Sequence, residues 1–176
     1  MPTLVEAPSL TLEAFHAQYD GEKPYYEYWN GEAVQKTMPT LIHSLIQKIL
    51  CFLLDAMGYE SSAEIKLKLA QAYEPIPDVI AWERGSMQGP YPTKPFDVVI
   101  EILSPEDAFS RVLRKCRLYE KWGIRRVIVI DPVERLVWHF EGGVPRETDV
   151  VALRRDRALM AEQVWADLDR RLEPSE

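Results

Sequence analysis

The spacing of apolar and polar residues predicts a chain that alternates helices with short strands. Apolar residues recur at helical spacing in four segments, bounded by capping or stop residues such as Thr11, Thr40, Gly58 and Gly123. Short runs that alternate or are rich in β-branched residues predict strands. The expected helices cover about 11–19, 40–57, 105–122 and 159–172, and the expected strands cover 24–29, 32–36, 64–69, 76–82, 98–103, 126–130, 135–140 and 150–152.

Asn30-Gly31 is the strongest turn signal in the chain. Both residues of a two-residue hairpin turn take positive φ, which this pair adopts readily. The turn sets Trp29 opposite Glu32. It also sets Glu27 opposite Val34, so the two acids lie on one face of the hairpin. We expect Glu27 to be solvated, and Glu32 either to be solvated or to contribute to a site.

The run Val98–Leu103 carries an acid where burial is expected. It is too short and too β-branched for a helix, so it predicts a buried central strand. Glu101 lies in its middle, and a carboxylate in an apolar strand is costly unless a cation, a proton or hydrogen bonds compensate it. Asp78 lies in the preceding strand. If the two strands pair, the alternation of side chains allows both carboxylates to meet on one surface of the sheet.

Two explanations of Glu101 stay open at this point. In the first, it forms a structural ion pair with a buried Lys or Arg. In the second, Asp78 and Glu101 hold a divalent ion, because hard oxygen ligands on rigid strands suit Mg²⁺ or Mn²⁺.

The helix expected over 105–122 contributes a cation. The solvent side of its helical projection carries Arg114, Arg117 and Lys121. Lys115 instead falls in the buried arc, beside Tyr119. Because a Lys is rarely buried without a partner, we expect its ammonium group to face the two carboxylates.

The helix expected over 40–57 places His43 on its apolar side and Gln47 on its polar side. A histidine in an apolar arc is more often a hydrogen-bonded core residue than a ligand. Near a phosphate-binding site, His43 could also orient a carboxylate or a phosphate.

Composition and charge narrow the class of protein. The 176 residues suit one domain, 1–176, and 47% hydrophobic with 28% charged residues indicates a globular protein. A net charge of -7 argues against a broad basic surface, so any contact with nucleic acid must come from a local patch. The first ten residues show no signal peptide, and polar residues interrupt the longest apolar stretch, 41–57. We therefore expect a cytoplasmic protein without a membrane segment.

In their order along the chain, these features resemble the Uma-two (Uma2) family of restriction-endonuclease-like proteins, a branch of the PD-(D/E)XK nuclease superfamily. The matching segments are Tyr28-Trp29-Asn30-Gly31-Glu32, His43, Pro77-Asp78, Val99-Ile100-Glu101-Ile102-Leu103-Ser104-Pro105, Lys115, Tyr119, Gly123 and Asp131-Pro132. The resemblance implies an α/β (α+β) fold with a mixed central β-sheet flanked by helices, a restriction-endonuclease-like core and an N-terminal hairpin.

The chain departs from the superfamily pattern at the lysine. That lysine usually lies two residues after the acid, where this chain has Leu103. In families of this kind it is thought to have moved to the following helix, where Lys115 lies. Arg111 stands where relatives often carry Asp.

The resemblance implies metal-dependent hydrolysis of phosphodiester bonds in nucleic acid, with DNA rather than RNA as the expected partner. Asp78 and Glu101 would bind Mg²⁺ or Mn²⁺, and Lys115 would orient a water or neutralise developing charge. The Leu103 carbonyl and Glu32 would be further ligands.

Four more residues would support this activity. His43 and Tyr119 would hold the metal ligands in position without contacting the metal themselves. Lys66 and Lys68 would contact the nucleic-acid backbone, although a solvated strand face explains both lysines equally well.

Two other functions stay open. The same scaffold could be a catalytically inactive, homo-oligomeric binding or interaction module, which the acidic net charge favours. It could also be an enzyme that acts on a small phosphate ester.

Overall fold

A mixed six-stranded sheet forms the centre of the fold in the computed structural model, which describes residues 9–174. The neighbouring strands β6 and β7 are parallel, and every other neighbouring pair in this sheet is antiparallel. The expected mixed central sheet is therefore confirmed. In spatial order the strands are β3 (Tyr59–Ala63), β5 (Val79–Glu83), β6 (Val98–Ile102), β7 (Arg126–Asp131), β8 (Leu136–Glu141) and β9 (Val144–Glu147).

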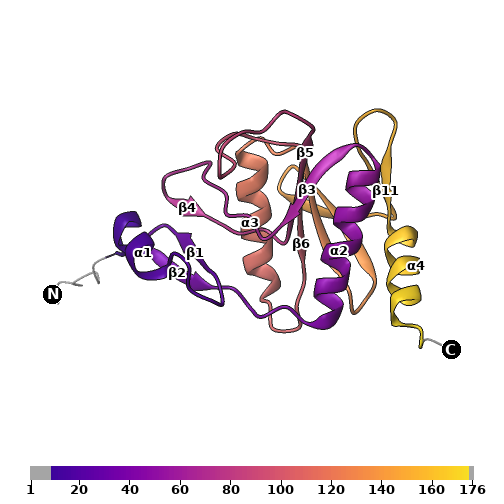
Figure 1. Ribbon diagram of the computed structural model, residues 1–176, viewed down its shortest axis with the longest axis horizontal. Coiled ribbons are helices and arrows are strands. Elements are labelled where there is room, and N and C mark those ends of the chain that lie inside the picture. Colours follow the sequence, from indigo (N-terminus) through magenta and orange to yellow (C-terminus); the bar gives the residue numbers. More distant parts are fainter. Residues whose placement is uncertain (1–8, 175–176) are drawn as a thin grey trace.

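Helices cover both faces of this sheet (Figure 1). Helices α2 (Leu41–Ala56) and α4 (Ala161–Leu172) pack on one face, and α3 (Phe109–Lys121) packs on the other. The alternation of side chains in β6 explains this layering. Val98, Ile100 and Ile102 belong to the core with α2 and α4, whereas Val99 belongs to the core with α3.

The N-terminal part of the chain adds a smaller sheet beside α3. Strands β1 (Tyr26–Trp29) and β2 (Glu32–Gln35) form the hairpin predicted from Asn30-Gly31, with Trp29 opposite Glu32. Asn30 and Gly31 have φ of 45° and 93°, as this turn requires. The remaining elements are α1 (Leu12–Tyr19), β4 (Tyr73–Glu74), which pairs with β1, and the antiparallel pair β10 (Val150–Ala152) and β11 (Ala158–Met160).

The predicted strand over residues 64–69 is wrong. Strand β3 ends at Ala63, and Glu64 has a φ of 55°, which breaks the extended backbone. Helix α3 begins at Phe109 rather than at Pro105, because residues 104–107 close a turn in which Asp107 bonds Ser104. The sequence pattern also did not predict β3, β4, β9 or β11.

Residues 1–8, most of the segment in which no signal peptide is expected, lie outside the described residues. Within residues 9–174, no helix combines the length and the hydropathy that a membrane crossing requires.

Candidate active site

Asp78 and Glu101 lie on the face of the sheet that α3 covers. Val79 pairs with Ile100, so the same register, continued by one residue, sets Asp78 opposite Glu101. The Ile102 N–H donates to Asp78 Oδ2 at 2.7 Å. Both carboxylates are buried, with exposed fractions of 4% and 5%, and both line one cavity of about 50 Å³. The fold thus brings the two acids together, as the strand pattern predicted.

Lys115 reaches the same cavity from the second turn of α3. Its Nζ lies 2.8 Å from Glu101 Oε1 and 2.9 Å from Glu101 Oε2. It also donates to Glu27 Oε1 at 2.9 Å. The buried side of the helical projection therefore identified the position of this cation correctly, but not its second partner.

Glu27 is buried, with an exposed fraction of 4%, so the expectation that it is solvated is wrong. Its Oε1 accepts the Ile76 N–H as well as Lys115, and its Oε2 accepts from Trp29 Nε1 at 3.0 Å. The missed signal lay in the hairpin itself. Glu27 shares a face with Trp29 and Val34, and two large apolar neighbours indicate a covered face.

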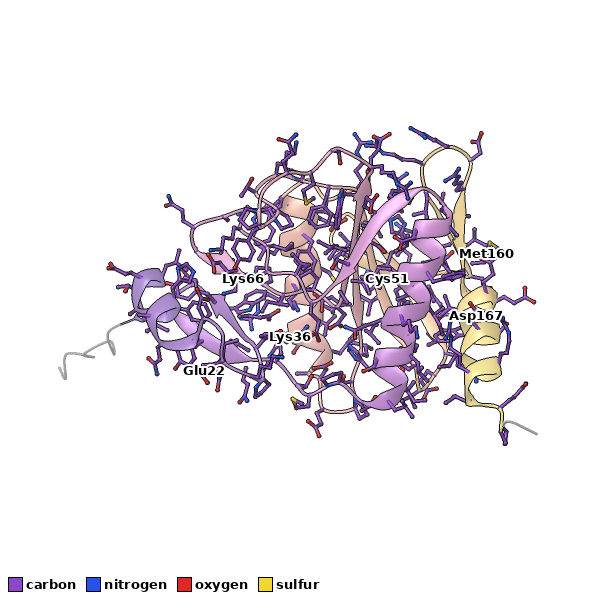
Figure 2. The ribbon with its side chains drawn as sticks, viewed as in Figure 1. Glu22, Lys36, Cys51, Lys66, Met160 and Asp167 are labelled. Carbon is purple, nitrogen blue, oxygen red and sulfur yellow. The ribbon has the colours of Figure 1, made fainter. Side chains whose placement is uncertain are left out.

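Lys36 supplies a second ammonium group that sequence reasoning did not identify. Its Nζ donates to Asp78 Oδ1 at 2.9 Å and to the Ile76 carbonyl at 2.7 Å. Figure 2 marks Lys36 on the segment that leads from β2 to α2. A lysine just past the end of a short strand carries no burial pattern, so only the tertiary fold reveals its partner.

Helix α2 holds Asp78 in place. His43 Nε2 lies 3.3 Å from Asp78 Oδ1, and its Nδ1 lies 3.3 Å from Ser104 Oγ. Gln47, expected on the polar side of the helix, is buried and donates to the Asp78 carbonyl at 3.2 Å. These contacts give His43 a defined partner, which the helical projection alone did not.

The charges of this cluster do not balance. Burial alone would raise the pKa of Asp78, but Lys36 and His43 hold it well below its usual range. Burial raises the pKa of Glu101 to about 7, against the opposing effect of Lys115 and with the help of Asp78. Lys115 has a raised pKa, since its carboxylate neighbours outweigh its burial. The cluster contains three carboxylates and two ammonium groups: Glu27, Asp78, Glu101, Lys36 and Lys115. The excess negative charge favours the uptake of a proton or a cation.

Tyr119 fixes the orientation of the Glu101 carboxylate. Its hydroxyl donates to Glu101 Oε1 at 2.6 Å, and burial raises the pKa of this hydroxyl well above its ordinary value. Tyr119 is therefore a neutral donor that orients the carboxylate.

The structure places the remaining predicted residues elsewhere. Glu32 is exposed and lines a different pocket. Leu103 lines another pocket with Asp131, while the backbone beside Asp78 is that of Ile102. Neither Glu32 nor Leu103 lines the cavity of Asp78 and Glu101. Their roles as further metal ligands stay predictions.

Lys66 and Lys68 do not lie on a strand face. Lys66 Nζ pairs with Asp20 Oδ1 at 2.5 Å, and Lys68 Nζ lies 3.8 Å from Glu74 Oε1. Neither lysine lines the cavity that contains Asp78. Their contact with a nucleic-acid backbone stays a prediction.

The family model Uma2, described as "Putative restriction endonuclease", matches residues 12–173 of the chain. The chain belongs to the Uma2 family. Its matched range includes the hairpin, both carboxylate strands and α3. A search of curated proteins found no match.

Two solved structures resemble this Uma2 chain. One is the crystal structure of a "putative nuclease belonging to DUF820" from Anabaena variabilis ATCC 29413, with a TM-score of 0.78 at 21% identity, covering 90% of this chain and 99% of that chain. It shows that the two share a fold. The other, a cryo-electron microscopy structure of a DrdV–DNA complex, aligns with a TM-score of 0.41 at 14% identity over 70% of this chain and 10% of that chain, which is too weak to support an argument.

The carboxylate oxygens of this Uma2 site suit a divalent ion as ligands. Within residues 9–174, Asp78 Oδ2 and Glu101 Oε2 each accept a single hydrogen bond, which leaves each oxygen a lone pair. No group of three or more Asp, Glu, His or Cys side chains in the described part of the chain is arranged around a metal position. Mg²⁺ does not require such a group, since it often binds one or two carboxylates together with waters and substrate phosphate.

Proposed function

We propose that this protein is a metal-dependent nuclease that hydrolyses phosphodiester bonds at the cavity of Asp78 and Glu101. One observation carries the proposal. Two carboxylates from neighbouring strands and the Lys115 ammonium group from α3 meet in one buried cavity. Membership of the Uma2 family, described as "Putative restriction endonuclease", supports the same reaction class.

Asp78 and Glu101 would hold Mg²⁺ or Mn²⁺ through Oδ2 and Oε2. Such an ion, when bound, lowers the pKa of a coordinated water and offsets charge on a phosphate. The Ile102 N–H and the Tyr119 hydroxyl fix the orientation of the two carboxylates. This support matters because ligands that are oriented before binding lose little entropy when they bind.

Lys115 has the clearest role in charge stabilisation. Its raised pKa keeps it protonated at neutral pH, and it lies between Glu27 and Glu101. An ammonium group fixed in a site with little water stabilises negative charge that develops on the phosphate oxygens. Lys36 holds a second positive charge 2.9 Å from Asp78 Oδ1, so it would assist beside that carboxylate.

A cleavage assay tests the proposal. Purified protein is incubated with single- and double-stranded DNA and with RNA, in Mg²⁺, in Mn²⁺ and in EDTA. We expect cleavage in the presence of metal and none in EDTA, with DNA cleaved faster than RNA. Absence of cleavage of every substrate in both metals would reject the nuclease.

The ion pairs themselves favour a second candidate, an inactive binding module. Lys36 and Lys115 already compensate much of the negative charge of the buried carboxylates, as a purely structural cluster would require. Calorimetric titration with Mn²⁺ separates the two candidates. The nuclease requires a heat of binding that the Asp78→Asn variant loses, whereas the inactive module takes up no Mn²⁺ near neutral pH.

A further inference from the structure

A second pocket lies between the hairpin and α3, next to the carboxylate cavity. It has a volume of about 390 Å³, within the range of ~300–1,000 Å³ typical of ligand sites. Trp29 and Tyr73 line one wall, and Arg111 and Arg114 line the other. We call it the α3 groove. Arg111 also lines the cavity of Asp78 and Glu101, so the two spaces adjoin.

The helical wall of the α3 groove is basic. Arg111, Arg114, Arg117 and Lys121 follow one another at steps of three, three and four residues, which places them along one side of α3. All four are exposed. Among the ion pairs within residues 9–174, none includes Arg111, Arg114 or Lys121. A protein of net charge -7 thus concentrates uncompensated positive charge along one groove.

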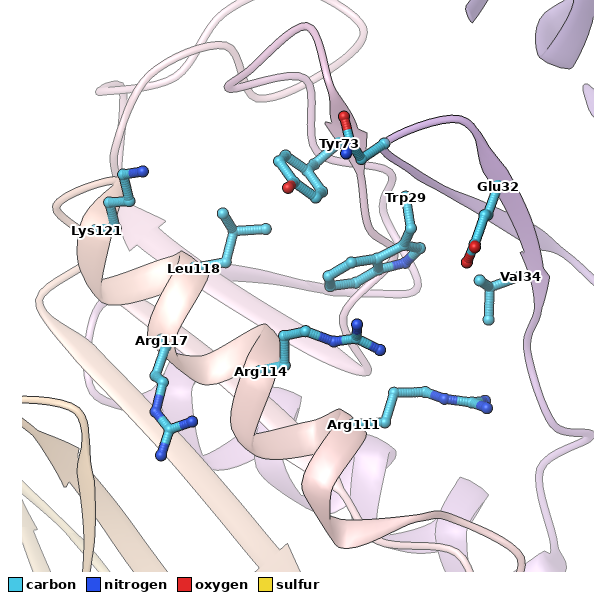
Figure 3. A pocket seen from close by; sticks show the side chains of 10 residues that line it. Trp29, Glu32, Val34, Tyr73, Arg111, Arg114, Arg117, Leu118 and Lys121 are labelled. Carbon is cyan, nitrogen blue, oxygen red and sulfur yellow. The ribbon is translucent and has the colours of Figure 1, made fainter. Parts of the chain in front are cut away.

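The opposite wall offers aromatic surface. Trp29 and Tyr73 are half-buried, with their ring centroids 5.7 Å apart, and the Arg114 guanidinium lies 5.9 Å from the centre of the Trp29 ring. Figure 3 shows Arg111 and Arg114 extending from α3 toward Trp29 and the hairpin. A half-buried aromatic ring facing a row of cations is the arrangement that binds unpaired bases together with their phosphates.

We propose that the α3 groove binds a single-stranded segment of nucleic acid, with a base stacked on Trp29 and the phosphates along Arg111 and Arg114. The inference rests on the proposed function, because it names the form in which the substrate reaches the carboxylates. A base pair within a duplex hides its faces in the stack, so only an unpaired base can lie on Trp29. Glu32, an exposed acid on the hairpin wall, places the phosphates along α3 rather than along β2.

Trp29 also connects the groove to the site. Its Nε1 donates to Glu27 Oε2, and Glu27 Oε1 accepts from Lys115. A base that stacks on Trp29 therefore rests on a ring that is fixed to the buried cluster. This contact would position the adjacent phosphate toward Asp78 and Glu101.

Fluorescence anisotropy with labelled oligonucleotides tests the inference in EDTA, where no cleavage occurs. We expect single-stranded DNA to bind more tightly than the same sequence as a duplex. Trp29→Ala should weaken single-strand binding roughly 5- to 150-fold, and Trp29→Phe should restore most of it. Arg114→Ala should make the negative slope of log affinity against log salt shallower by about 0.7. The matched control is Arg171→Ala, an exposed arginine on α4, which should leave binding unchanged.

A further variant is expected to bind single strands more tightly, a result that damage to the fold would not produce. Glu32→Gln removes the acid of the groove and should tighten single-strand binding. Unchanged affinity of Trp29→Ala and Arg114→Ala, duplex binding as tight as single-strand binding, or no gain with Glu32→Gln would overturn the inference. These outcomes are independent of the nuclease proposal. If the protein cleaves with metal but its groove variants bind normally, the nuclease proposal stands and the groove proposal is rejected. If the groove binds single strands but the protein cleaves nothing, the groove proposal stands and the nuclease proposal is rejected.

Discussion

Glu101→Gln abolishes metal-dependent cleavage and leaves the fold intact, if Glu101 holds the ion. The amide keeps the shape of the side chain and still accepts the Tyr119 hydroxyl, but it loses the negative charge. Mutation of residues that only support metal ligands typically costs ~10–100-fold, so loss of a ligand itself should lower the rate by more than roughly 100-fold. Initial rates with Mn²⁺ on the best substrate measure this effect.

Glu106→Gln is the matched control, since Glu106 is exposed in the turn before α3. It makes the same chemical change five residues away and should cleave at the wild-type rate. Circular dichroism and thermal melting establish that both variants are folded. A Glu101→Gln rate within a few-fold of wild type would reject the assignment of Glu101.

Lys115→Met should destabilise the protein by about 3–5 kcal/mol, because it leaves the carboxylates of Glu27 and Glu101 buried without their shared cation. Urea denaturation at pH 8 measures the loss as a lower midpoint at an unchanged slope. Lys121→Met, on the exposed side of the same helix, should change stability by no more than about 0.5 kcal/mol.

The loss of stability caused by Lys115→Met should also depend on pH. Lys115 is the strongest influence that lowers the pKa of Glu101, so its removal raises that pKa further above the value in the unfolded chain. The folded variant then binds more protons than the unfolded chain, and its stability rises as pH falls. The difference from wild type should shrink between pH 8 and pH 5. An equal difference at both values, or a variant as stable as Lys121→Met, would contradict the buried ion pairs.

The carboxylate strands were predictable because their signals are local. The β-branched run around Glu101 has few alternatives to a central strand, and alternation assigns Glu101 to the face opposite Ile100. The helical projection then placed Lys115 on the buried side of α3. Each of these steps needs only the period of one element.

The rest of the site depends on how distant elements pack, which periodicity does not encode. Glu27 is buried because the hairpin packs beside α3. Lys36 contacts Asp78 because the segment after the hairpin passes beside the residue that precedes β5. Lys66 was misplaced for a different, local reason. Its alternating surroundings suggest a strand, but the positive φ of Glu64 ends β3 before it.

The central claim is that Asp78 and Glu101 together bind a divalent ion. Anomalous diffraction from crystals grown with Mn²⁺ tests it most directly. The account predicts a peak within coordination distance of one carboxylate oxygen of Asp78 and one of Glu101. Crystals that show no such peak at an Mn²⁺ concentration that supports cleavage, or a peak bound by other residues, would contradict it.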